Sequence, residues 1–315
     1  AIIEKQAGSF FAGILKTIRD DVSNGESVSN AFERQGHLFS GLYIAMLRSG
    51  EAGGNIPDAI EEYLSYFERS LQIRRKVKAA SVYPGILSIC SIFVVAFLIV
   101  FVVPAITGTF VASGATLPLF TRALLWFSEV VRAHAWLIIL GGLLVTAGIF
   151  QYLRTQKGRL LFDTFYLKLP FLGELSTRYS TAVFTASLSS VLKSGLPLNQ
   201  ALPVSAGVIQ NRLMHNRVKQ AIQMVERGQG FSRALKEINI FPDMALRIIS
   251  AGEEGGSLEK VLKDVAVFYE KDLESRLSML TSVIEPALMV LMGIVIGFIM
   301  LAMYLPIFQM AGAMS

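Results

Sequence analysis

The chain has 315 residues, of which 53% are hydrophobic and 17% are charged, and its net charge is +5. Soluble domains carry about 25% charged residues. Here the shortage is concentrated in three long uncharged runs, so the composition excludes an ordinary soluble protein and predicts a membrane protein. The one cysteine, Cys90, lies in an apolar run, which excludes an internal disulfide and argues against a zinc or redox role.

Residues 1–79 form the first predicted helical module. Helical spacing and turn residues predict several short helices before residue 49. The glycines of the SGEAGG segment (49–54) should end the last of these, and Asn55 and Pro57 suit the N-cap and first turn of the long amphipathic helix that follows. No stretch shows a convincing period-two alternation, so we expect an antiparallel helix bundle.

This module and the span that follows it recur later in the chain. An ungapped alignment pairs Gly50 with Gly252, Glu51 with Glu253, Gly53 with Gly255, Gly54 with Gly256, Pro84 with Pro286 and Pro104 with Pro306. Agreement at so many glycines, glutamates and prolines indicates a duplicated unit, in which a soluble helical module leads into a transmembrane helix. Residues 175–203 have no counterpart in the first copy, so we expect the natural protein to carry roughly thirty or more residues before Ala1.

Each uncharged run is long enough to cross a bilayer core, which takes about 20 apolar residues. We therefore expect an all-α membrane protein with two homologous cytoplasmic helical bundles and three transmembrane helices. The expected order is a first module (1–79), a transmembrane helix (80–105), a periplasmic loop with an interfacial segment (106–132), a second transmembrane helix (133–153), a second module (154–281), a third transmembrane helix (282–309) and a periplasmic tail (310–315).

Basic residues beside the spans predict this orientation. Lys and Arg gather in the cytoplasmic segments that flank transmembrane helices, so both modules should be cytoplasmic. We expect the same residues to contact anionic lipid, at about 1 kcal/mol for each charge near the surface, although charges that only stop membrane transfer would show the same pattern. This basic collar consists of Arg74, Arg75, Lys76 and Lys78 before the first span and Arg154, Lys157 and Arg159 after the second.

The two G-E-x-G-G turns are the most distinctive motifs outside the spans. A phosphate-binding loop needs a following Lys-Ser or Lys-Thr pair, and neither copy has one. Glycines of this kind commonly cap a helix at positive φ, but a cap does not require a carboxylate. Partner binding, hydrogen bonding between helices and a divalent-cation ligand therefore stay open for the glutamates. The candidate partner-binding residues are Glu51, Gly53, Gly54, Glu253, Gly255 and Gly256.

No sequence pattern points to catalysis. His37, His134 and His215 are scattered, and the chain has no nucleophile elbow or zinc-protease motif. The spans carry no Asp, Lys or Arg, which an ion-coupled transporter would be expected to need. Glu285, beside Pro286 at the mouth of the third span, suits a role at the helix end. We expect no catalytic, cofactor or metal site, and a protein that is not an enzyme.

One further segment carries a family resemblance. Residues 188–202, LSSVLKSGLPLNQAL, fit the pattern L-x-x-x-L-x-S-G-x-P-L-x-x-A-L. With the paired G-E-x-G-G turns and the proline-bounded spans, this segment resembles the F-domain proteins of type II secretion and type IV pilus machines, the inner-membrane platform proteins of the GspF/PilC type. The resemblance covers the whole chain, except that the front of the first module is missing.

The resemblance implies a non-enzymatic platform protein in the bacterial inner membrane. Its implied role is to couple a hexameric cytoplasmic assembly ATPase to the polymerisation of pilin or pseudopilin. The implied partners include other inner-membrane assembly proteins and further copies of the chain, and no nucleic acid. The alternatives are a membrane transporter or channel subunit with cytoplasmic helical regulatory modules, and a receptor or membrane-tethered enzyme.

Overall fold

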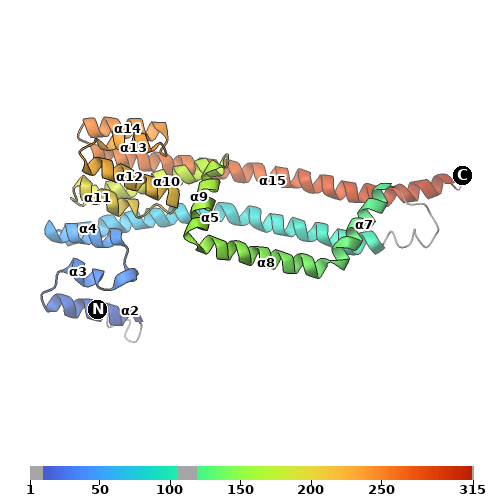
Figure 1. Cartoon of the computed structure of the whole chain (residues 1–315), viewed down its shortest axis with the longest axis horizontal. Helices are drawn as coiled ribbons and strands as arrows, with labels where there is room; N and C mark the ends of the chain where they lie inside the picture. Colours follow the sequence, from blue (N-terminus) through green and yellow to red (C-terminus); the bar gives the residue numbers. More distant parts are fainter. Residues whose placement is uncertain (1–9, 106–118, 314–315) are drawn as a thin grey trace. The chain divides into compact units, whose positions relative to one another are not determined.

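The computed structural model describes residues 10–105 and 119–313, and these ranges contain helices and no strand. The chain divides into unit 1, residues 1–75 and 159–275, and unit 2, residues 76–158 and 276–315. The helices, labelled in Figure 1, are α2 (Phe10–Ser23), α3 (Val28–Glu33), α4 (Gly41–Ala52), α5 (Ile56–Phe97), α7 (Leu119–Ala133), α8 (Ala135–Arg154), α9 (Gln156–Lys168), α10 (Leu172–Lys193), α11 (Leu198–Ala206), α12 (Arg212–Glu226), α13 (Phe231–Ile238), α14 (Asp243–Glu254) and α15 (Leu258–Ala313). The all-α class expected from the sequence is confirmed.

The core of unit 1 is built around α10. This helix is buried along much of its length, and Phe184, Leu188 and Val191 on it are fully enclosed. Apolar residues of α11–α15 pack around it, and each of these helices turns one apolar face inward. Leu42 and Met46 of α4 belong to the same core. Helices α4 and α5 of the first module therefore join the core of the second module, while Ile14, Ile18 and Ala31 of α2 and α3 form a small cluster of their own.

Polar contacts also join these two modules within unit 1. The carboxylate of Glu62 on α5 accepts hydrogen bonds from the Ser190 hydroxyl at 2.8 Å and the Lys193 ammonium at 2.5 Å, both on α10. The Ser49 hydroxyl donates to the Ser194 carbonyl at 2.5 Å. Half-exposed ion pairs stabilise little, so these contacts orient α4 and α5 on α10 while apolar burial supplies most of the stability.

The succession α2–α5 is matched by the succession α12–α15. In both, a glycine with positive φ follows the first helix: Gly25 has φ +93° and Gly228 has φ +89°. A short helix comes next, then a helix of twelve residues that ends in the G-E-x-G-G motif, then a long helix. This order agrees with the alignment of the two halves.

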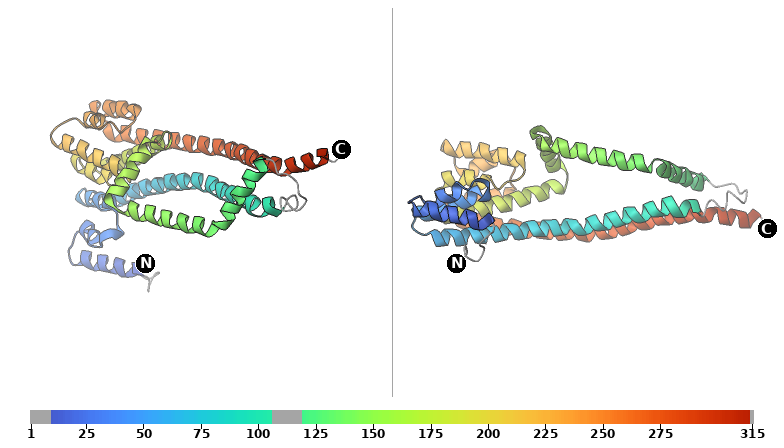
Figure 2. Two further views of the ribbon diagram at one scale, coloured as in Figure 1. Left: turned by 45° about the vertical axis from the view of Figure 1, so that its right-hand side comes forward. Right: turned by 90° about the horizontal axis from the view of Figure 1, so that it is seen from below.

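In unit 2, α5 and α15 run side by side (Figure 2), and the Tyr83 hydroxyl donates a hydrogen bond to Glu285 at 3.1 Å. These two residues occupy the same position in the repeat. α7 contacts α15 and the segment that follows α5, because the Thr121 hydroxyl donates to the Ala302 carbonyl and Leu124 packs against Val103 and Ile299.

A π-helical turn, Leu98–Val102, follows α5 directly. In such a turn each carbonyl bonds the N–H five residues on, but for Ile99 that residue is Pro104, which has no N–H. The Ser128 hydroxyl of α7 donates to the Ile99 carbonyl at 2.6 Å. The π-turn thus presents a backbone acceptor to a neighbouring helix, and a serine is placed to meet it.

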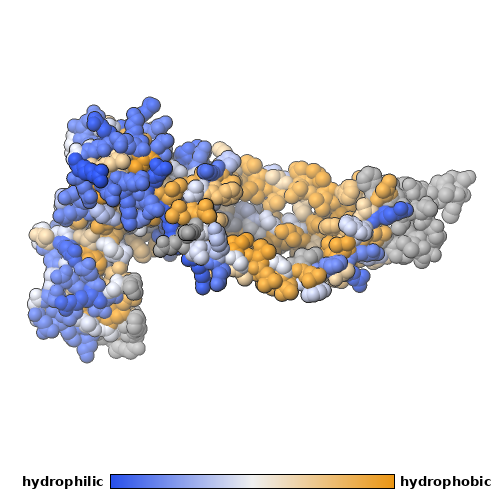
Figure 3. Space-filling view, viewed as in Figure 1, coloured by the Kyte–Doolittle hydropathy of each residue, from blue (hydrophilic) through white to orange (hydrophobic). Residues whose placement is uncertain are grey.

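Apolar side chains cover the outside of the predicted spans. Ile92 and Phe93 of α5, Leu144 of α8 and Ile294 of α15 are all exposed. Figure 3 shows hydrophobic residues over the parts of α5, α8 and α15 in unit 2, and mostly hydrophilic residues over α12–α14 in unit 1. Three helices are long and apolar enough to cross a membrane: those that contain α5, α8 and α15.

Two local expectations need revision. Ser49, Gly50, Glu51 and Ala52 form the last turn of α4 and not part of the break, which is confined to Gly53 and Gly54. Helix α9 was not expected, because its charges interrupt the apolar pattern. Its apolar residues Leu161 and Phe165 are exposed, and Leu167, near the end of the helix, is partly buried against the core of unit 1, so the helix has only a weak core-facing periodicity.

Ser128→Ala should lower the free energy of unfolding of unit 2 by about 0.5–1.5 kcal/mol, because hydrogen bonds between helices in bilayers contribute about that much. Reversible unfolding in bicelles would measure the loss. Thr146→Val is the matched control, since the Thr146 hydroxyl bonds only carbonyls of its own helix, α8. An equal loss in both variants would contradict a bridging role for Ser128.

Candidate functional site: the paired glutamate turns

Each G-E-x-G-G motif ends a helix in a tight turn. After α4, the Gly53 N–H donates to the Ser49 carbonyl at 2.9 Å and the Asn55 N–H donates to the Gly50 carbonyl at 2.7 Å. Gly54 has φ +72° and its counterpart Gly256 has φ +64°, in the left-handed region that glycine adopts without strain. These are helix C-terminal caps that satisfy the last carbonyls of the helix.

The first glycine of each motif permits a close helix approach. A Cβ built on Gly50 would lie 2.5 Å from the Cβ of Ala59 on α5, and one built on Gly252 would lie 2.7 Å from the Cβ of Val261 on α15. Both glycines are buried. The motif therefore sets how tightly each twelve-residue helix packs against the long helix that follows it.

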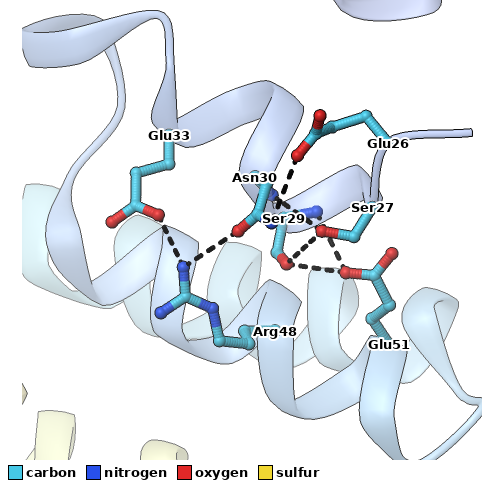
Figure 4. Close-up of polar contacts among 7 residues, drawn as sticks. All are labelled: Glu26, Ser27, Ser29, Asn30, Glu33, Arg48 and Glu51. Carbon is cyan, nitrogen blue, oxygen red and sulfur yellow. Dashed lines mark hydrogen bonds and ion pairs between the residues drawn. The ribbon is translucent and has the colours of Figure 1, made fainter. Parts of the chain in front are cut away.

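The glutamate of the first motif caps a different helix. One oxygen of Glu51 accepts from the Val28 N–H at 2.6 Å, and the other accepts from the Ser29 N–H at 3.1 Å and the Ser29 hydroxyl at 2.6 Å. Figure 4 shows Glu51 beside Ser29 and Ser27 at the start of α3. The first N–H groups of a helix have no partner within it, and a carboxylate there also meets the positive end of the helix dipole.

Glu253 repeats this arrangement in the second copy. Its two oxygens accept from the Phe231 N–H at 2.6 Å and the Ser232 N–H at 2.8 Å, at the start of α13. In each copy the glutamate side chain thus ties two elements together: the helix that carries it and the start of the short helix before it. Of the roles left open by the sequence, hydrogen bonding between helices is the one observed for both glutamates.

The pKa values of both carboxyls agree with this geometry. The hydrogen bond from the Ser29 hydroxyl is the main reason that the pKa of Glu51 lies below its ordinary value. Burial by itself would raise the pKa of Glu253, but the hydrogen bonds from Ser232 and from the Phe231 N–H outweigh it and the pKa is lowered. Both side chains are therefore held as carboxylates at neutral pH.

The two copies differ beside the motif. In the first copy, Arg48 of α4 pairs with Glu33 at 2.6 Å and donates a hydrogen bond to the Asn30 side chain at 3.4 Å, which links α4 to α3 (Figure 4). In the second, a cavity of about 520 Å³ lies between α13 and α14. Its lining residues are Ser232, Arg233, Lys236, Asp243, Leu246, Arg247, Ser250 and Glu254.

The candidate partner-binding residues fall into two groups. Glu51 and Glu253 are occupied by helix N-termini, whereas Gly53, Gly54, Gly255 and Gly256 lie exposed at the surface. Contact of these turns with a partner remains a prediction.

Within residues 10–105 and 119–313 there is no group of three or more His, Cys, Asp or Glu side chains placed to hold a metal ion. The capped serines, Ser29 and Ser232, were not singled out, although the alignment with one inserted residue pairs them.

The basic collar is solvent-exposed where it is described. Arg74, Arg75, Lys76 and Lys78 are exposed on α5, and Arg159 is exposed on α9. Arg154, also exposed, stacks its guanidinium 4.7 Å from the centre of the Phe150 ring. The side chain of Lys157 lies outside the described part of the structure. Lipid contact by the collar remains a prediction.

Glu253→Gln should destabilise the protein at neutral pH by about 1–3 kcal/mol, because two backbone donors lose a charged acceptor. The folded-state pKa of Glu253 is lowered, so its contribution is present above the ordinary value of 4.5 and is lost as the pH falls below it. The difference between wild type and variant should therefore shrink in acid. Thermal unfolding in detergent between pH 7 and pH 3 would measure it. Glu254→Gln is the matched control, because the Glu254 carboxylate accepts from the Ser250 hydroxyl of its own helix and caps no other helix.

Gly50→Ala should destabilise the protein by about 1–3 kcal/mol, because the added methyl group overlaps Ala59. Gly53→Ala is the matched control: its Cβ would meet only the Ser49 carbonyl, at 3.4 Å, and its φ of −85° suits any residue. Thermal unfolding of the two variants would decide the point. Equal melting temperatures would contradict a packing role for Gly50.

Comparison with known proteins places these features in one family. The family described as "Type II secretion system (T2SS), protein F" matches residues 1–104 and 184–306. The type IV pilus assembly protein PilC of Thermus thermophilus is 31% identical over 317 residues, covering 100% of this chain and 78% of that protein. The type II secretion system protein F of Pseudomonas aeruginosa is 34% identical over 297 residues, covering 94% of this chain and 73% of that protein.

A second Pseudomonas aeruginosa protein, the type IV pilus assembly protein PilC, is 31% identical over 304 residues, covering 96% of this chain and 81% of that protein. Relatives from both kinds of machine thus align along nearly the whole chain, including both glutamate turns and the three apolar helices. The apolar helices and the family together indicate an inner-membrane protein. The chain belongs to the type II secretion protein F family, which includes the PilC proteins of type IV pilus assembly.

Proposed function

We propose that this chain is a non-enzymatic platform protein of a type IV pilus or type II secretion machine. It couples a cytoplasmic assembly ATPase to the polymerisation of pilin or pseudopilin subunits. Both helical modules lie in the cytoplasm, the C-terminal tail lies in the periplasm, and the protein acts as a homo-oligomer with other inner-membrane assembly proteins. Family membership supports the assignment to one of these two machines. The long helices α5 and α15, described below, support the coupling mechanism.

The observation that carries this proposal is the continuity of α5 and α15. α5 runs from Ile56 to Phe97 and α15 from Leu258 to Ala313, and each continues as one helix through its interior prolines, Pro84 in α5 and Pro286 and Pro306 in α15. Each begins in a polar module and ends in an apolar, exposed span. A helix resists bending far more than a loop does, so a force on either module is transmitted into its span.

The basic collar and α9 support attachment to the cytoplasmic membrane surface. Arg159 on α9 is exposed, and so are Leu161 and Phe165 on the same helix. A helix with exposed apolar and basic residues binds to the headgroup region of anionic membranes. The collar residues on α5 and the start of α9 hold the modules against that surface.

Seven glycines inserted after Val77 and after Ser278 should abolish filament assembly or secretion, because a flexible segment cannot transmit the movement. Seven alanines at the same places are the matched control, since they extend each helix by about two turns and nearly preserve its facing. Pilus counts or secreted cargo in the organism that encodes the chain would be measured. Normal function with both glycine insertions would rule out the lever mechanism.

The full-length protein should copurify from membranes with an assembly ATPase and a prepilin-like protein, as the proposed coupling requires. Affinity purification after cross-linking, with the Glu253→Gln variant in parallel, would test the association. Recovery of a transport substrate-binding protein, and of neither expected partner, would favour a transporter subunit instead.

A further inference from the structure

The contact between the two modules in unit 1 shows what one face of α4 and α5 binds. Leu42 and Tyr66 are only 5% and 8% exposed, because they pack into the core that α10 and α11 build. Around them, Glu62 binds Ser190 and Lys193 at the end of α10, as described above. This face packs against a hairpin of two helices, α10 and α11, which are joined by a turn that starts with Ser194 and Gly195.

The repeat places an equivalent face on α14 and α15. In the register that pairs Glu51 with Glu253, the counterparts of Leu42, Glu62 and Tyr66 are Met244, Asp264 and Phe268. The chemistry is the same at each position: an aliphatic side chain, a carboxylate and an aromatic ring. Ala251 takes the place of Ser49.

This second face is uncovered. Met244 is 50% exposed and Phe268 is 41% exposed, against 5% and 8% for their counterparts. Asp264 is exposed and forms no ion pair with any residue of the described ranges. Asp264 and Phe268, four residues apart, share one face of α15, and the repeat places Met244 of α14 beside it as Leu42 lies in the first copy. Exposed large apolar side chains next to an unpaired carboxylate indicate a surface that binds a partner.

The α10–α11 hairpin of the chain itself is already engaged on both sides. The Ser189 hydroxyl of α10 donates to the Glu259 carbonyl of α15 at 2.9 Å, and Arg178 of α10 pairs with Asp272 of α15. Its other side holds Glu62 of α5. The hairpin therefore covers α4 and α5, and it leaves the equivalent face of α14 and α15 for a second hairpin.

We propose that the face carrying Met244, Ala251, Asp264 and Phe268 is a docking surface for a two-helix hairpin of the α10–α11 type. The apolar side of the hairpin covers Met244 and Phe268. A lysine at the end of its first helix pairs with Asp264, as Lys193 pairs with Glu62. This inference rests on the repeat and its contacts, and not on the function proposed above.

The test supplies such a hairpin to the full chain. Residues 172–206 are fused ahead of Ala1 through a long Gly-Ser linker, in a Cys90→Ser background with Ala251→Cys as the reporter. Maleimide labelling in detergent should be at least tenfold slower in the fused chain than in the unfused one. A reporter at exposed Gln220 on α12, as Gln220→Cys, should label equally in both and shows that the fold is intact.

A charge exchange shows whether the protection is specific. Asp264→Lys should restore fast labelling at Ala251→Cys, and Lys193→Glu in the added hairpin alone should then slow it again. Equal labelling of fused and unfused chains would overturn the proposal. So would slow labelling of the unfused chain that becomes fast on dilution, because that result assigns the face to a second copy of the protein.

Discussion

The structure depends on two helices, α5 and α15. Each has a polar first part in a helical module and an apolar second part in a membrane span. In the bilayer every backbone polar group must be satisfied within the protein, and a helix achieves this by itself. A helix that is already formed in a polar module can therefore enter the membrane without a loop. α5 and α15 do so, with charged residues along their first halves and an apolar surface along their second halves. Where the regular pattern is interrupted, at the π-turn before Pro104, a serine from α7 supplies the hydrogen-bond donor.

The glutamate turns fix what precedes each long helix. Three residue types act within one motif: a glycine that lets two helices approach, a carboxylate that caps the short helix before, and a glycine at positive φ that reverses the chain. None of these contacts involves a residue from the other copy. Each turn is thus a local device that positions one long helix, which explains why the same residues recur at the base of both α5 and α15.

Much of this architecture could be predicted from the sequence, because the signals are local. Uncharged runs located the spans, glycines located the ends of the short helices, and aligned glycines and prolines revealed the repeat. The role of Glu51 could not be derived in this way, since the donors that it meets, on Val28 and Ser29, are far away in the sequence. Helix α9 was missed for a different reason: Leu161 and Phe165 are exposed, and its contact with the core is made near its end by Leu167, so its apolar pattern is weak.

The core that α4 and α5 share with the second module also lay beyond the sequence. Two repeats suggest two separate bundles, but Leu42 and Met46 of the first module are buried with residues of α10 and α11, while Ile14 and Ile18 of α2 belong to a separate small cluster. Because α4 and α5 are covered in this shared core, the burial of their residues can be compared with that of the aligned residues of α14 and α15. Equivalent residues are buried in one copy and exposed in the other, and a difference in burial between aligned positions points to a surface that the described contacts leave open.

The central claim is that both modules lie on the same side of the membrane, so that both long helices carry force in the same direction. The most direct measurement is labelling by a membrane-impermeant maleimide, in a Cys90→Ser background, of Asn24→Cys in the first module, Gln220→Cys in the second and Ser315→Cys at the C-terminus. In intact spheroplasts we expect labelling of position 315 alone, and labelling of positions 24 and 220 only after the cells are lysed. Labelling of one module in intact spheroplasts and of the other only after lysis would contradict it.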